Sequence, residues 1–219
     1  MIRLFLLFLF ATPLLAVSSH EYEGKQIHTW PGPGTNPWFV KFSTGLNSGY
    51  YGPTVRLTYR YLQPSQPVVG FFPRATSVDL TLPSPKVWYN NDTRPWPFGN
   101  GIAAYDLVLP QNVVLHPGPN GEAAHFVFNV PATAEYAIQA DFFAIARLAN
   151  VVAHMLVNGV EFWTSDVSGG EGQTTFVPHR ISTKLTLRRN SFVDFVVDCP
   201  PGGDSAGWIG LNARLTATF

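Results

Sequence analysis

The sequence predicts an all-β protein, folded as one two-sheet antiparallel jelly-roll β-sandwich that follows a cleaved signal peptide. Three observations lead to this prediction. Apolar and polar residues alternate in most segments after residue 54, no segment keeps a helical period over three turns, and 19 Gly with 19 Pro suit many short connections. A chain of 219 residues is long enough for one large core, so we expect a single sandwich domain.

The N-terminal segment has the pattern of a secretory signal peptide. Arg3 precedes an apolar run over residues 4–15, and small residues follow at 16–19. The run is too short to span a bilayer, which disfavours the alternative of a retained anchor. We therefore expect a signal peptide at 1–19, an extended arm with a Pro/Gly hinge at 20–37 and the sandwich at 38–219. The protein is then secreted, and extracellular or at the cell surface.

Alternation places the strands in order along the chain. In segment 54–61 the apolar residues Val55 and Leu57 alternate with Arg56 and Thr58. The pattern recurs at 78–82, 126–130, 136–142 and 209–219, and it assigns the final Phe219 to an apolar face. Asn158 and Gly159 predict a two-residue hairpin turn between strands at 151–157 and 160–163. A turn at 189–191 separates apolar runs at 185–187 and 192–197.

Composition limits the classes of partner. The formal net charge of the whole chain is zero, which disfavours nucleic acid. Cys199 is the only cysteine, so the chain has no disulfide of its own, and we expect Cys199 to be a small buried side chain. The aromatic residues, 17 Phe, 8 Tyr and 6 Trp, suit a core that must stabilise the fold without crosslinks.

From residue 115 onward the chain resembles a bacterial-type jelly-roll module found in secreted and surface proteins. The resemblance lies in the segments 115–119 (LHPGP), 128–131 (FNVP), 135–138 (EYAI), 157–160 (VNGV), 192–198 (FVDFVVD) and 204–207 (DSAG), and more loosely in 36–38 and 87–90. It implies a sandwich of the carbohydrate-binding-module type. It supplies no catalytic residues.

Catalytic and metal sites are weakly indicated. Gly203-Asp204-Ser205-Ala206-Gly207 fits a serine nucleophile motif, with His125 as its base and Asp141 or Asp166 as the partner, but a strand and not a helix follows it. We therefore predict no enzyme and no catalytic residue, and a serine hydrolase is a distant third hypothesis. The histidines are isolated, so no zinc site or other cofactor is expected. A weak Ca²⁺ site is conceivable from carboxylates that the chain brings together, namely Asp166, Asp194, Asp198 and Asp204.

Two segments carry the functional hypotheses. Trp88, Tyr89, Asn90 and Trp96 combine rings with polar groups and could contact a glycan, while the alternative is that the tryptophans fold inward. Asn91 heads a glycosylation sequon.

The arm contains Tyr22, Ile27 and Trp30. It could add as a strand to a neighbouring copy, or pair within its own domain. The leading hypothesis is thus a secreted subunit that self-assembles into a fibril or matrix through strand addition or head-to-tail docking. The alternative is a monomeric, lectin-like carbohydrate-binding module.

Overall fold

The computed structural model describes residues 18–23, 37–44, 46, 54–60, 67–73, 85–90, 96–97, 107–108, 112–119, 121–145, 149–169, 176–199 and 207–219. Within these residues every regular element is a strand, in agreement with the predicted fold class. None of the described residues belongs to a helix that could span a membrane.

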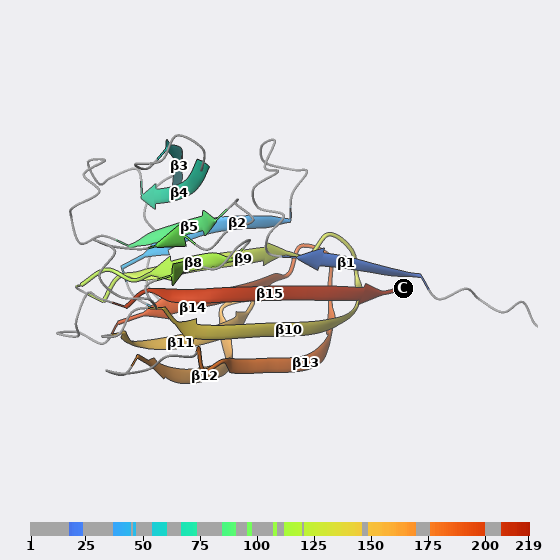
Figure 1. The fold of residues 1–219 in the computed structure, drawn as a ribbon. Coiled ribbons are helices and arrows are strands. Elements are labelled where there is room, and N and C mark those ends of the chain that lie inside the picture. The colour runs from blue at the N-terminus through green and yellow to red at the C-terminus, as the bar shows by residue number, and fades with distance from the viewer. Residues whose placement is uncertain are drawn as a thin grey trace, which may run out of the picture.

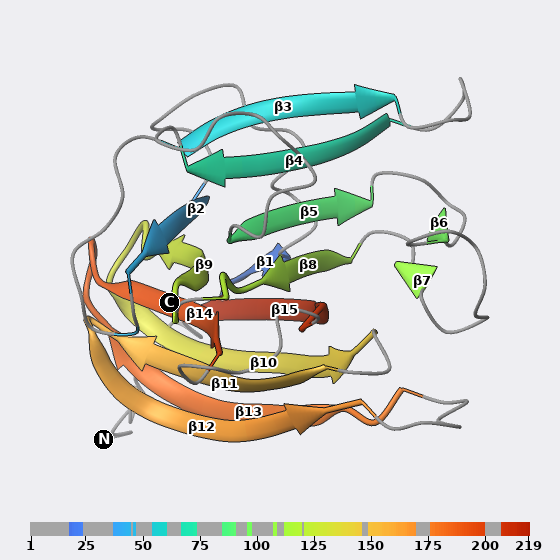
Figure 2. The ribbon, with the colours of Figure 1, turned by 90° about the vertical axis from the view of Figure 1, so that its left-hand side faces the viewer.

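Two antiparallel sheets form the sandwich (Figure 1). The larger, sheet A, runs in the order shown in Figure 2: β13 (His179–Leu187), β10 (Ala134–Ala144), β15 (Ile209–Thr218), β8 (Val113–His116), β5 (Lys86–Asn90), β4 (Pro67–Pro73) and β3 (Thr54–Arg60), with β1 (Ser19–Glu23) also paired to β15. The smaller, sheet B, has the order β12 (Val160–Ser168), β11 (Asn150–Val157), β14 (Phe192–Asp198), β9 (Ala123–Asn129) and β2 (Trp38–Ser43). A separate pair joins β6 (Trp96–Pro97) to β7 (Leu107–Val108).

The inner faces of the two sheets enclose one aromatic-rich core. The rings of Trp38 and Phe126 stack with centroids 4.7 Å apart, and those of Phe142 and Trp163 stack at 5.7 Å. Each fully buried large side chain, such as Trp38, Phe126 or Phe142, contributes about 1.5–3 kcal/mol through removal of apolar area from water. Cys199 is buried, as predicted, and its thiol donates to Asn150 O at 3.9 Å. The core therefore provides the cohesion that a disulfide would otherwise supply.

The sequence patterns located several strands and turns correctly. Asn158 and Gly159 join β11 to β12 with φ angles of 53° and 80°, and Asn190 has a φ of 66° in the turn before β14. β15 alternates as predicted, with Leu211 and Leu215 buried. The predicted strands at 126–130 and 136–142 correspond to β9 and β10, whereas the one at 78–82 lies outside the described residues.

Phe219 is the exception in the last strand. The pattern assigned it to the apolar face, but β15 ends at Thr218 and the Phe219 side chain is 52% exposed. The pairing explains the difference, because β15 pairs with β10 only as far as Thr218, opposite Glu135, and the Phe219 amide donates to Ser18 O instead. Alternation along one strand does not show where its pairing ends.

Candidate functional site

The outer face of sheet A carries a polar groove of about 400 Å³ across three strands. Its floor is β10, in which Ile138 and Phe142 point into the core while Gln139 and Asp141 point outward. Strand pairing aligns the polar side chains in two rows across the sheet. The first row is Ser182, Gln139 and Arg214, and the second is Arg180, Asp141 and Asn212.

Ion pairs hold the two arginines of the groove. Arg180 Nε donates to Asp141 Oδ1 at 2.8 Å, and this hydrogen bond with the carboxylate charge raises the pKa of Arg180. Arg214 lies 3.6 Å from Glu21 and 3.4 Å from Glu23 on β1. The guanidinium groups are thereby oriented but remain largely solvent-accessible, with side-chain exposures of 67% and 49%. They retain N–H groups that can donate to a ligand.

The described residues that were predicted to contact a glycan do not line this groove. Trp88, Tyr89 and Asn90 belong to β5 and are 5%, 1% and 1% exposed. The ring of Trp88 lies 6.3 Å from that of Trp208, and burial together with the charge of Glu23 raises the pKa of Tyr89 to about 12. For Trp88 alone, this burial is what the inward-folding alternative expects. The side chain of Trp96, and Asn91, lie outside the described residues, so their roles stay predictions.

A second polar cluster lies on the outer face of sheet B. Ser43, His125 and Asp194 come from the adjacent strands β2, β9 and β14, which the sequence alone does not bring together. His125 Nδ1 lies 3.0 Å from Asp194 Oδ2, and His125 Nε2 lies 2.6 Å from Ser43 Oγ. Because a carboxylate only accepts hydrogen bonds, Nδ1–H donates to Asp194 and Nε2 accepts from the Ser43 hydroxyl. The connectivity is that of a Ser–His–Asp triad.

Burial separates this triad from a hydrolase site. Ser43 and His125 are 0% exposed and Asp194 is 5% exposed, so a substrate carbonyl has no described path to the hydroxyl. The sequence had chosen His125 as a base but had given it different partners. Asp141 instead pairs with Arg180 in the groove, and Ser205 lies outside the described residues.

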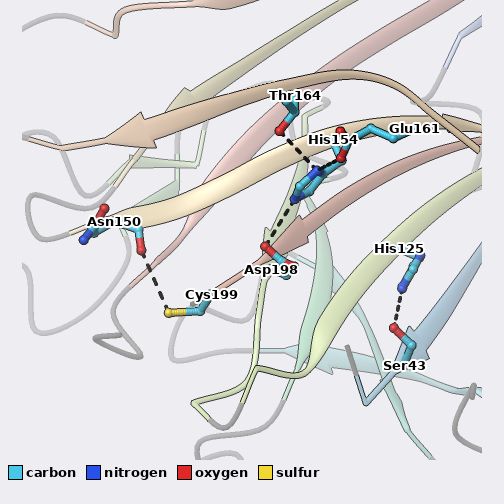
Figure 3. A network of polar contacts seen from close by, with 8 residues as sticks. All are labelled: Ser43, His125, Asn150, His154, Glu161, Thr164, Asp198 and Cys199. Atoms are coloured by element: carbon cyan, nitrogen blue, oxygen red, sulfur yellow. Dashed lines mark hydrogen bonds and ion pairs between the residues drawn. The ribbon is translucent and has the colours of Figure 1, made fainter. Parts of the chain in front are cut away.

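His154 on β11 forms a third polar group, and Figure 3 shows it with its partners Glu161, Thr164 and Asp198. Its Nδ1 is 2.8 Å from Glu161 Oε2 and 3.2 Å from the Thr164 hydroxyl, and its Nε2 is 3.3 Å from Asp198 Oδ1. Burial acts to lower the pKa of His154, but the hydrogen bonds and negative charges of Asp198 and Glu161 outweigh it and raise that pKa overall. The imidazolium form is thus favoured at this position.

The structure holds no clear metal centre among the residues it describes. No three His, Cys, Asp or Glu side chains there are grouped as metal ligands would be. Asp194 and Asp198 bond to His125 and His154. Asp204 lies outside the described residues, so the weak Ca²⁺ site remains a prediction.

The described part of the arm pairs within its own chain. Ser19–Glu23 forms β1, in which Tyr22 pairs with Leu215 of β15. The ring centroids of Tyr22 and Phe128 are 5.1 Å apart, and the partly buried Tyr22 packs against the core. This arrangement corresponds to the first-strand alternative. Ile27 and Trp30 lie outside the described residues, and strand addition to another copy stays a prediction.

Comparison with known proteins yields structural likeness only. No family model and no curated protein sequence matches the chain. A family 35 carbohydrate binding module from Clostridium thermocellum is similar at 12% identity, covering 90% of this chain and 97% of its own, with a TM-score of 0.34. The CBM51 of GH95 from Clostridium perfringens has 16% identity, coverages of 55% and 78%, and a TM-score of 0.32. The C-terminal CBM6 of LamC from Zobellia galactanivorans has 13% identity, coverages of 48% and 78%, and a TM-score of 0.30. Likeness at this level assigns neither a ligand nor a residue role to the present chain.

Proposed function

We propose that this protein is a non-catalytic carbohydrate-binding module that holds a saccharide in the polar groove of sheet A. The observation that supports the proposal is the pair of polar rows across β13, β10 and β15. Each row crosses three hydrogen-bonded strands, so the side chains start from fixed backbone positions. A ligand that needs several converging hydrogen bonds benefits from such preorganisation.

The groups in the groove match the chemistry of a saccharide. A sugar hydroxyl both donates and accepts, so it needs acceptors and donors side by side. Asp141 supplies acceptors, Arg180 and Arg214 supply donors, and the amides of Gln139 and Asn212 supply both. None of the residues that line the groove is aromatic. We therefore expect affinity to depend on hydrogen bonds more than on ring stacking.

The proposed place of action is outside the cell. The support is the apolar run at residues 4–15 with its single preceding Arg3, a pattern that directs export. Soluble and insoluble polysaccharides are the ligands that such an exported module meets. N-terminal sequencing of the exported protein tests this part, and a protein found only in the cytoplasm would contradict it.

Binding to a panel of polysaccharides, measured by affinity electrophoresis and calorimetry, tests the groove. In the double variant Asp141→Ala/Arg180→Ala, a bound glycan loses a charged acceptor and a charged donor. Each charged hydrogen bond is typically worth about 1.5–3 kcal/mol, so we expect at least about a tenfold loss of affinity. The variant Asn212→Ala should lower the affinity for the same glycan without removing an ion pair.

A matched control exists on the same two strands. Glu135→Ala/Lys184→Ala also removes one ion pair between β10 and β13, at 3.5 Å, but lies outside the groove. Its glycan affinity should equal that of the wild type. Equal losses in the two double variants, or no binding to any polysaccharide of the panel, would overturn the proposal.

A further inference from the structure

One end of the sandwich gathers exposed apolar side chains. This turn end consists of the loop 130–133, the hairpin turn 158–159, the turn 188–191 and Phe219, which pairing brings together: Val130 N donates to Ser191 O, and Asn158 N donates to Phe192 O. Five large hydrophobic side chains are exposed among the described residues. Val160, Phe192 and Phe219 lie at the turn end, with exposures of 70%, 37% and 52%, and Phe162 follows on β12 at 48%.

The fifth such side chain lies at the other end of the molecule. Val177 is 56% exposed and precedes His179, which pairs with Phe142. Leu187, at the far end of the same strand, pairs with Ala134 at the turn end. Single exposed apolar side chains are common on protein surfaces. The informative feature is that most of those described here lie together at one end of the molecule.

Cations accompany the apolar side chains of the turn end. Arg188 and Arg189 are exposed in the turn before β14, and neither forms an ion pair with a described residue. The Lys41 ammonium lies 5.0 Å from the centroids of both Phe39 and Phe192. By contrast, Glu135, which stands opposite Thr218 in the strand pairing, forms an ion pair with Lys184, so its negative charge is already balanced.

The described N-terminal end of the chain lies at this same end of the sandwich. Ser18 O accepts a hydrogen bond from Phe219 N, and Ser19 pairs with Thr218. Figure 1 shows β1 beside the C-terminal end of β15.

We propose that the turn end is a docking surface for an anionic lipid bilayer. Phe192, Phe219 and Val160 enter the headgroup region, and Arg188 and Arg189 contact the anionic headgroups, a combination that peripheral membrane surfaces use. A second copy of the chain fits less well, because a two-fold contact through this face puts two copies of the cations Arg188 and Arg189 into one interface, with no described carboxylate to pair with them. The groove of sheet A is not part of the turn end, so the protein can hold lipid and glycan together.

Co-sedimentation with vesicles tests the proposal, with the protein in the form its host exports. The probes are vesicles of phosphatidylglycerol and phosphatidylcholine in equal parts, and vesicles of phosphatidylcholine alone. We expect binding to the mixed vesicles that falls as salt rises, and little binding to the neutral ones. Since each cation near an anionic surface is worth about fivefold in affinity, Arg188→Glu/Arg189→Glu should reduce binding at least about 25-fold.

Variants separate the apolar contribution from a general effect. Phe192→Ser/Phe219→Ser should lose vesicle binding, whereas Val177→Ser, an exposed apolar residue at the opposite end, should bind as the wild type does. Thermal unfolding checks that each variant is folded, and Phe219→Ser alone serves if the double variant is not. Equal vesicle binding by all variants overturns the proposal. It is also overturned if the wild type does not bind vesicles and analytical ultracentrifugation shows that the same substitutions convert a dimer into monomers. Glycan affinity of these variants should stay unchanged, which keeps this test separate from that of the groove.

Discussion

Removal of the Asp194 carboxylate should destabilise the fold strongly. In the variant Asp194→Ala the His125 Nδ1–H loses its acceptor at 3.0 Å, in a side chain that is 0% exposed. Water therefore cannot replace the lost partner. A buried donor left in this way costs about 1–3 kcal/mol, and hydrogen bonds to a charged group are about twice as strong as neutral ones. We expect a loss of about 3 kcal/mol in the free energy of unfolding.

Urea denaturation followed by tryptophan fluorescence measures the loss. The midpoint should fall while the slope with urea concentration stays constant, because the area exposed on unfolding is nearly unchanged. For a domain of this size the unfolding temperature falls by about 2–4 °C for each kcal/mol, so a decrease of about 6–12 °C should accompany it.

Two further variants show which part of the network matters. Asp194→Asn keeps a side-chain oxygen that can accept from His125, and it should lose about 1 kcal/mol. Ser43→Ala removes the donor at 2.6 Å from Nε2 and should also lose about 1 kcal/mol. If the free energy of unfolding of Asp194→Ala lies within about 0.5 kcal/mol of that of the wild type, the hydrogen bond does not stabilise the fold and the reasoning is refuted.

Three other predictions follow from single positions. The raised pKa of His154 favours its charged form in the folded state, so its stabilising contribution is complete below about pH 6.5 and is lost as pH rises through the folded-state pKa. The stability difference between wild type and His154→Gln should therefore shrink between pH 5.5 and 8.5 in urea titrations, and a difference that grows would contradict the sign. In Gly210→Ala the new Cβ would overlap the Phe143 ring, so calorimetry should show a loss of about 1–3 kcal/mol in the free energy of unfolding. In the comparison variant Gly159→Ala the Cβ clashes with nothing, and the only strain is that of its positive φ. Tyr22→Ala should lose about 3 kcal/mol through its contact with Phe128, and an unchanged melting temperature would show that β1 does not stabilise its own domain.

The fold could be read from the sequence because local patterns carry it. Alternation in β15 and the Asn158–Gly159 turn depend on neighbours along the chain, and both match the structure. The groove depends on register between strands that are distant in sequence. Asp141 and Asn212 each stood on the polar side of a predicted strand, but only the pairing of β10 with β15 brings them to one row. The triad was missed for the same reason, since Ser43 and Asp194 lie 82 and 69 positions from His125.

The location of the proposed site follows from how each outer face uses its polar groups. On sheet B the outer face is buried at His125, His154 and Asp194, where an unpaired polar group is costly away from water. His125 bonds to Asp194, and His154 bonds to Glu161 and Asp198, so both imidazoles are engaged inside the protein. At β5 and β8 the outer face of sheet A is covered as well, with Trp88 and His116 only 5% exposed. At the groove residues of β13, β10 and β15 the same face stays open, and its amides and guanidinium groups are accessible to water. A saccharide that replaces this water exchanges one set of hydrogen bonds for another at fixed positions, which makes the groove the part of the described surface best suited to bind one.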